Sequence, residues 1–264
     1  MNINQFYGIE GEKPLDNLVP DGGFCGIFRT IGVIGDSLAS GELESFEEGI
    51  TGFHDFYEYS WGQYMARTIG CKVYNFSRGG MTAKEFVESY AARCGAYNYE
   101  NLCQAYIIAL GVNDMNQAYE LGDVERAVKE NPSKDNQSFL TYYAKIIKSI
   151  KAKQPQAKIF LMTFPYCPQN PQEKRAKRDA WSEGIRVLAE KFENTYVLDF
   201  RRYAPAYDEK WYKTFHLGHM TPAGYLLTAK MVMSYIDWII RNNPDEFAQV
   251  GFIGTPYSYN KLGE

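Results

Sequence analysis

The sequence predicts an α/β protein in which helices cover both faces of a five-stranded parallel sheet. Five short apolar runs are strand-like, and they lie at residues 30–35, 72–76, 105–110, 158–164 and 196–198. Helix-like segments alternate with them, at residues 60–69, 82–93, 137–153, 173–192 and 221–241. Strands that alternate with helices are typical of a parallel sheet with helices on both faces.

Each strand assignment depends on a local pattern. The run 30–35 is rich in β-branched residues and ends at Asp36. The run 105–110 is apolar throughout, as expected of a strand that is covered on both faces. The run 158–164 is stopped by Pro165. The runs 72–76 and 196–198 complete the sheet.

The helix assignments depend on periodicity and on end signals. Apolar residues recur at helical spacing across 137–153, and Gly70 closes the helix that begins near Ser60. Thr221 is a good N-cap, and Pro222 suits the first helical position. The polar, acidic stretch between Ser37 and about Tyr57 is predicted to be a loop.

The chain of 264 residues is long enough for one large domain, and no linker-like segment divides it. We therefore expect a single domain over residues 1–264. Residues 1–28 are turn-rich and are expected to wrap its surface, and residues 244–264 form an aromatic-bearing tail.

Charge and cysteine content narrow the class of protein. Lys and Arg number 28 against 32 Asp and Glu, so the net charge is −4 without long blocks of one sign. That balance predicts neither a nucleic-acid surface nor a membrane anchor. The N-terminus shows no secretory signal, and five scattered cysteines without a C-x-x-C pair are typical of reduced thiols. We expect a cytoplasmic protein with no metal site and no cofactor.

Four short segments carry residues suited to one chemistry. Ser37 follows the first strand as a candidate nucleophile, and His219 precedes the last helix as the candidate base, since an imidazole titrates near ~6.5. Gly80 and Asn113 follow the second and third strands, where a backbone N–H and a side-chain amide can stabilise an oxyanion together with the N–H of Ser37. Ala39 stands where a nucleophile elbow would have its last glycine, which argues against the α/β-hydrolase fold.

These segments resemble the four blocks of the SGNH, or GDSL-type, hydrolase superfamily. They read Gly35-Asp36-Ser37-Leu38, Asn75 to Gly80, Gly111-Val112-Asn113-Asp114, and His219 to Tyr225, so the resemblance spans residues 31–225. It implies a flavodoxin-like three-layer α/β/α fold and serine esterase chemistry. It also implies that Ser37 is the nucleophile, that Gly80 and Asn113 are oxyanion donors, and that His219 is the base.

The chain departs from the family at position 216, where His216 replaces the aspartate that usually orients the base. Three interpretations are open: a Ser–His dyad held by a backbone carbonyl, another carboxylate in place of the aspartate, or a shifted alignment in which His216 is the base. As an orienting group, His216 could hydrogen-bond His219, but a neutral imidazole supplies no negative charge. Asp199 and Asp208 are the carboxylate candidates. We favour the dyad.

The expected function is hydrolysis of small acyl esters, especially acetyl groups on a carbohydrate, through an acyl-enzyme on Ser37. A lipase or lysophospholipase for longer chains is one alternative, and a carbohydrate-binding protein with weak catalysis is another. Arg78, Asp114, Phe164 and Tyr166 are candidate pocket residues. For Asp36 and Asp114, whose neighbours are Ser37 and Asn113, a hydrogen bond that fixes a loop is the favoured role. The expected partner is a small-molecule ester, with no nucleic acid or membrane anchor, and the sequence does not predict an oligomeric state.

Overall fold

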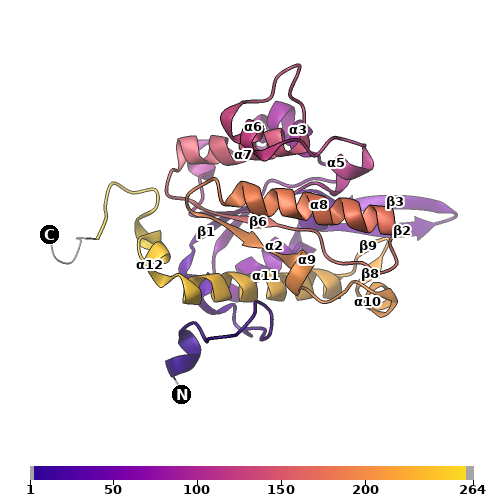
Figure 1. Cartoon of the computed structure of the whole chain (residues 1–264). Coiled ribbons are helices and arrows are strands. Elements are labelled where there is room, and N and C mark those ends of the chain that lie inside the picture. The colour runs from indigo at the N-terminus through magenta and orange to yellow at the C-terminus, as the bar shows by residue number, and fades with distance from the viewer. Residues whose placement is uncertain (1–2, 260–264) are drawn as a thin grey trace.

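A five-stranded, all-parallel sheet forms the centre of the computed structural model, which describes residues 3–259 (Figure 1). The strand order is β4-β1-β5-β6-β7. The strands are β1 (Thr30–Gly35), β4 (Lys72–Asn75), β5 (Ala105–Ala109), β6 (Lys158–Met162) and β7 (Thr195–Leu198). All five predicted strands and the predicted fold class are confirmed.

Strand β1 lies between β4 and β5 in a regular parallel register. Ile31 lies opposite Val73 on one side and Ala105 on the other. The carboxyl ends of these strands therefore meet at one edge of the sheet. Ligands of open parallel sheets bind at this edge, so the first three sequence motifs converge there.

Alternate strand residues point into two separate layers of core. Val33 and Ile107 pack on the face that carries α2 (Trp61–Ile69) and α11 (Pro222–Asn242). Ile34 and Ile108 point the other way, toward α7 (Phe139–Lys153) and α8 (Gln172–Ala189). Figure 1 shows α11 below the sheet and α7 above it. The molecule thus has three layers, helix, sheet and helix.

The end signals in the sequence correspond to real helix caps. The Ser60 hydroxyl accepts from the Gln63 N–H at 3.2 Å, and the Thr221 hydroxyl accepts from the Gly224 N–H at 3.2 Å. Gly70 ends α2 with a φ of 65°, a left-handed conformation that favours glycine. These caps fix where α2 and α11 begin, and where α2 ends, relative to the strands.

Shorter helices connect or extend these elements. The expected helix 82–93 begins at the N-cap Thr82 and passes through a π-helical turn at Phe86–Tyr90. The short helices are α1 (Ser37–Ser40), α3 (Ala83–Glu85), α4 (Ala91–Arg93), α5 (Val112–Asn116), α6 (Val124–Lys129), α9 (Phe200–Tyr203), α10 (Glu209–Phe215) and α12 (Pro244–Phe247).

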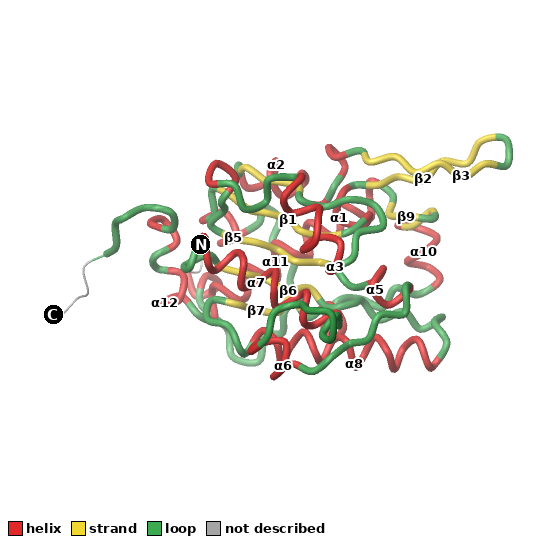
Figure 2. Tube along the Cα trace, turned by 90° about the horizontal axis from the view of Figure 1, so that it is seen from above, coloured by secondary structure: helices red, strands yellow, loops and turns green. Residues whose placement is uncertain are grey.

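The acidic stretch after Ser40 is a β-hairpin, so the prediction of a loop was wrong. Strands β2 (Glu42–Glu47) and β3 (Ile50–Asp55) pair antiparallel, and they project from the body of the molecule (Figure 2). Glu48 and Gly49 form the turn with φ of 50° and 83°, which matches the twist of a two-residue hairpin. Phe46 at the hairpin's outer end is 76% exposed, so the segment lacks the buried face by which a strand is usually recognised.

Two segments near the ends of the described chain, residues 23–28 and 247–250, pack on the α11 face of the sheet. A 3₁₀ turn at Gly23–Ile27 lies against α11, and Cys25 and Phe28 are fully buried. The predicted surface segment 1–28 therefore also contributes to the core. Phe247 and Val250 of the tail are buried as well, whereas residues 260–264 of that tail lie outside the described residues. None of the five cysteines, all described, forms a disulfide.

Candidate active site

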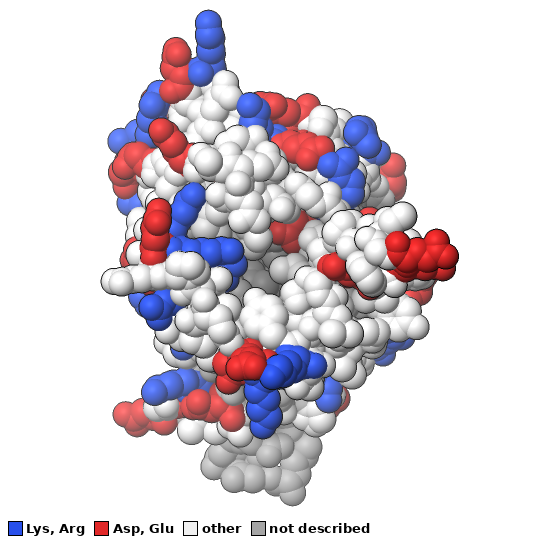
Figure 3. Space-filling view, turned by 90° about the vertical axis from the view of Figure 1, so that its right-hand side faces the viewer, with Lys and Arg blue, Asp and Glu red and all other residues white. Residues whose placement is uncertain are grey.

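A cavity of about 400 Å³ opens at the carboxyl edge of the sheet. Ser37, Asn113 and His219 all line it. Figure 3 looks onto this edge and shows a hollow near its middle, with acidic atoms at its wall. The other side chains of the wall include Leu38, Trp61, Asn116, Met162, Phe164, Arg178, Phe200, Tyr207, Tyr212 and His216. Three of the four residues predicted from the motifs therefore share one site.

Ser37 is held where β1 passes into the one-turn helix α1. Asp36 is its N-cap, and the Asp36 carboxylate accepts from the Leu38 N–H at 3.0 Å. Burial raises the pKa of Asp36 to about 6, although this hydrogen bond acts in the opposite direction. The favoured loop-fixing role of Asp36 is confirmed, because its carboxylate bonds the backbone of α1.

Asn113 is hydrogen-bonded to the residue that follows Gly80. Gly80 has a φ of 73° in the turn closed by the Met81 N–H on the Arg78 carbonyl. The Asn113 amide donates to the Met81 carbonyl at 3.1 Å, and an amide has a second N–H left to donate. Gly80 itself is not among the residues that line the cavity.

Asp114 holds the segment that follows Gly80 by a hydrogen bond to its backbone. It is fully buried, and its carboxylate accepts from the Ala83 N–H at 3.0 and 3.3 Å, at the start of α3. Burial raises its pKa to about 7. Asp114 does not line the cavity, so its role is to join the end of β5 to α3.

His219 lies between two carboxylates of the hairpin. Its Nε2 is 3.0 Å from Glu42 Oε1, and its Nδ1 is 3.3 Å from Glu44 Oε2. Its ring also meets that of Phe53 at 5.5 Å, edge to face. Burial raises the pKa of Glu42, and the neighbouring imidazole of His219 partly offsets this effect.

Two glycines leave space for these carboxylates. A Cβ on Gly79 would overlap the Glu42 carboxylate, and a Cβ on Gly218 would overlap that of Glu44. Gly218 has a φ of 70° in the tight turn between β8 (His216–Leu217) and β9 (His219–Met220). Side chains larger than hydrogen at these positions would push the hairpin carboxylates off the imidazole.

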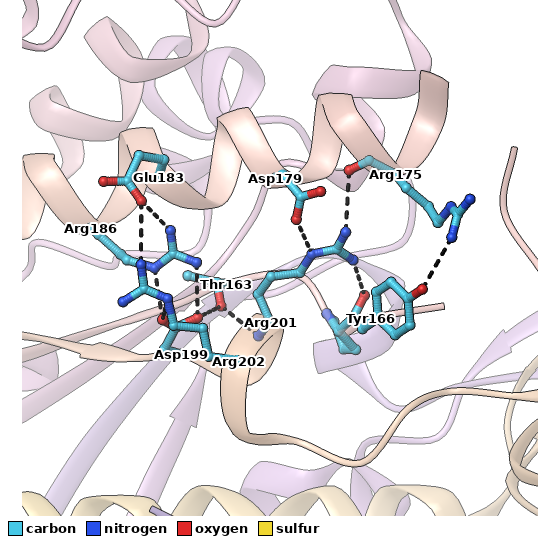
Figure 4. A network of polar contacts seen from close by, with 10 residues as sticks. Thr163, Tyr166, Arg175, Asp179, Glu183, Arg186, Asp199, Arg201 and Arg202 are labelled. Atoms are coloured by element: carbon cyan, nitrogen blue, oxygen red, sulfur yellow. Dashed lines mark hydrogen bonds and ion pairs between the residues drawn. The ribbon is translucent and has the colours of Figure 1, made fainter. Parts of the chain in front are cut away.

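None of the three predicted orienting groups bonds His219 within the described structure. Asp199 is buried in a polar network, where it pairs with Arg186 at 2.7 Å and accepts from the Thr163 hydroxyl at 2.9 Å (Figure 4). Asp208 caps α10 by accepting from the Trp211 N–H at 2.8 Å.

His216 is the third of those groups, and it lines the cavity beside His219. Its ring packs 4.8 Å from that of Tyr212. Burial and the nearby His219 lower its pKa. Asp199 and Asp208 were candidates beside the favoured dyad, and the fold commits each carboxylate to another partner, so neither contacts His219.

Of the four predicted pocket residues, only Phe164 lines the cavity. Arg78 pairs with Glu85 and lies over the ring of Tyr90. The Tyr166 hydroxyl accepts from Arg175, and the ring stacks under Arg201 in a different surface depression. The carboxylates of the hairpin were missed, although Glu42 and Glu44 alternate with Leu43 in the pattern of a strand.

Neither a metal site nor a membrane span is found over residues 3–259. This part of the chain holds no group of three or more His, Cys, Asp or Glu side chains placed to bind a metal ion. None of its helices is both long and apolar enough to cross a bilayer.

The strand order and the residues at the carboxyl edge define an SGNH-type hydrolase. The chain belongs to the GDSL-like lipase/acylhydrolase family, whose model matches residues 33–227. It is therefore a carboxylic ester hydrolase. No curated protein matches the chain significantly in sequence.

Solved structures share the fold at low sequence identity. A family two carbohydrate esterase from Clostridium thermocellum, in complex with cellohexaose, is 15% identical with a TM-score of 0.58, covering 90% of this chain and 67% of its own. An acetyl xylan esterase, AlAXEase, is 17% identical with a TM-score of 0.52, covering 78% of this chain and 98% of its own. A carbohydrate esterase family 2 enzyme from Corynascus thermopiles is 16% identical with a TM-score of 0.53, covering 79% of this chain and 65% of its own.

Proposed function

We propose that the protein is a serine esterase that removes small acyl groups, above all acetyl, from a carbohydrate. The observation that carries this proposal is the convergence of Ser37, Asn113 and His219 on one cavity at the carboxyl edge of the sheet. A hydroxyl, an amide and an imidazole are the groups needed to attack an ester and to stabilise the resulting oxyanion.

In the proposed reaction the Ser37 hydroxyl attacks the ester carbonyl, and Nε2 of His219 takes its proton. The oxyanion receives hydrogen bonds from the N–H groups of Ser37 and Gly80 and from the amide of Asn113. The tetrahedral intermediate then expels the alcohol, which takes the proton back from His219. Water, activated by the same imidazole, releases the acid from Ser37.

Two local features support this assignment of donors. The Gly80 N–H donates to no acceptor within residues 3–259, and it is therefore free to bind an oxyanion. The Asn113 amide is held in place by the Met81 carbonyl and keeps its second N–H. Since Glu42 contacts Nε2 in the present structure, the imidazole must exchange Glu42 for the Ser37 hydroxyl before attack.

The preference for a small ester rests on the size and lining of the cavity. Its volume of about 400 Å³ lies near the lower end of the usual range for ligand pockets, ~300–1,000 Å³. Its wall combines the rings of Trp61, Phe164 and Tyr212 with the polar groups of Asn116 and Arg178. The carbohydrate esterases among the structural relatives support an acetylated sugar as the substrate.

The test is a panel of acetylated sugars and p-nitrophenyl esters of increasing chain length, assayed with Ser37→Ala as the control. We expect activity to be highest with acetyl esters and to be lost in Ser37→Ala. Rates that rise from acetyl to octanoyl would favour a lipase or lysophospholipase. Glycan binding without turnover, and without labelling of Ser37 by a fluorophosphonate, would favour a binding protein. Activity that survives in Ser37→Ala would reject the mechanism.

A further inference from the structure

We propose that Glu44 is the carboxylate that orients His219, so that the projecting hairpin supplies what position 216 lacks. Glu44 is a positioning residue, since it acts on the ester only through the imidazole. This inference rests on the proposed function, in which His219 is the base.

The first observation is that a hairpin carboxylate reaches the far nitrogen of the imidazole. Glu44 Oε2 lies 3.3 Å from Nδ1 of His219, and β2 lies against β9, which carries the histidine. Residues two apart on a strand point to the same side, so Glu42 and Glu44 both face the ring. The Glu44 side chain is 26% exposed, and it retains access to solvent.

The second observation is that the histidine turn is shaped around this carboxylate. A Cβ at position 218 would overlap the Glu44 carboxylate, and the positive φ of Gly218 also favours glycine. His216, at the position of the missing aspartate, packs its ring on Tyr212. The turn at residues 216–219 thus lacks the family's aspartate at position 216, and its glycine at position 218 makes room for the Glu44 carboxylate.

Glu42 is the other candidate for orienting His219, and the two carboxylates differ in which imidazole nitrogen they contact. In a serine hydrolase, Nε2 takes the proton of the serine and the carboxylate holds Nδ1. Glu42 contacts Nε2, the nitrogen that Ser37 requires, whereas Glu44 contacts Nδ1. An Nδ1–H that donates to Glu44 leaves Nε2 as an acceptor, which is the tautomer needed to take the proton of Ser37.

Several other titratable groups lie near this ring or near the Glu42 carboxylate beside it, and their charges act on the site. On the hairpin, Glu42 contacts the ring and Asp55 lies near Glu42, while His54 bonds the Ser45 hydroxyl at 2.8 Å. Asp36 approaches from α1 and His216 from β8. Over the described residues, Glu44 forms no ion pair with Lys or Arg, so its charge acts on the imidazole.

The consequence for catalysis has two parts. Glu44 fixes the ring orientation and tautomer, and it stabilises the imidazolium that forms when Ser37 attacks. Replacing Glu44 by glutamine removes the charge at nearly constant shape, so kcat falls. Because an anion beside the ring favours its protonated form, the same change moves the acid limb of the pH–rate profile to lower pH.

The experiment compares Glu44→Gln and Glu44→Asp with Glu47→Gln, a matched control on the exposed outer end of β2. Hydrolysis of p-nitrophenyl acetate is followed from pH 5 to 9, and thermal unfolding confirms that each variant is folded. We expect Glu44→Gln to lower kcat on the order of 10²–10⁴-fold, with the acid limb shifted to lower pH. Glu44→Asp, which keeps the charge, should recover part of kcat and the wild-type acid limb.

The outcomes separate this inference from the function on which it depends. If Glu44→Gln matches Glu47→Gln in both kcat and acid limb while fluorophosphonate still labels Ser37, the role of Glu44 is rejected and the serine esterase stands. If Ser37 is not labelled and Ser37→Ala keeps its activity, the proposed function itself is rejected.

Discussion

Replacing Asp199 by asparagine is expected to destabilise the fold and to leave ester turnover unchanged. Asp199 lies at the end of β7, near the catalytic edge, but its carboxylate is committed to Arg186, Arg202 and the Thr163 hydroxyl (Figure 4). The Asp199 side chain is 6% exposed and that of Arg186 is 14% exposed. The charge is therefore compensated within the protein rather than by water.

The size of the effect follows from this burial. Removing one partner of a buried ion pair costs about 3–5 kcal/mol. The introduced asparagine would still offer an oxygen to Thr163, and Arg186 keeps Glu183 as a second partner, so we expect about 2–3 kcal/mol. For a chain of this size, that loss corresponds to a Tm lowered by roughly 5–10 °C.

The assay is thermal unfolding combined with kcat at 25 °C, where the variant remains folded. Asp208→Asn is the matched control, because asparagine is as good an N-cap as aspartate and Asp208 forms no ion pair within residues 3–259. A kcat loss on the order of 10⁴-fold with an unchanged Tm would show instead that Asp199 orients His219.

Three further substitutions test other parts of the site. Asn113→Ala should lower kcat on the order of 10²–10³-fold with little change in KM, because the lost donor acts on the transition state; a change in KM alone would argue against an oxyanion role. Burial raises the pKa of Asp114 from 3.8 to about 7. Between these two values the folded protein keeps the Asp114 carboxyl protonated, whereas the unfolded chain has lost that proton. The free energy of unfolding should therefore fall as the pH rises from about 4 to 7. Asp114→Asn, which can keep the bond from the Ala83 N–H, should flatten that decline in urea unfolding, and a slope equal to wild type would contradict the assignment. In a Glu44→Gln background, His216→Asp should raise kcat by restoring an acid at the family's own position. If the double variant is no faster than Glu44→Gln, the loss of kcat in Glu44→Gln is not caused by the missing negative charge.

The sheet and its motifs could be predicted because their signals are local. Continuous apolar runs such as 105–110 indicate strands that are buried on both faces, and the caps at Ser60 and Thr221 depend on side chains beside them in sequence. The convergence of Ser37 and Asn113 then follows from the parallel sheet, whose carboxyl ends share one edge.

The hairpin and its carboxylates could not be predicted in the same way. Its two strands carry exposed aromatic residues such as Phe46 and Phe53. The alternation of apolar and polar residues in β2 therefore does not mark a buried face. The contact of Glu44 with His219 joins residues 175 positions apart, and no sequence spacing predicts it. Asp199 was a candidate to orient His219 because it follows a strand at the carboxyl edge of the sheet. Its ion pair with Arg186 of α8 depends on how the helix packs on the sheet, and the sequence alone does not predict this contact.

The most direct test of Ser37 as the nucleophile is to trap the acyl-enzyme by rapid acid quench during turnover of p-nitrophenyl acetate. The modified residue is then mapped by mass spectrometry. We predict one added acetyl group on the peptide that contains Ser37, absent in Ser37→Ala and slower to form in Glu44→Gln than in Glu47→Gln. An acetyl group on another residue, or turnover by wild type with no acetyl group trapped while Ser37→Ala remains active, would contradict the claim that Ser37 is the nucleophile.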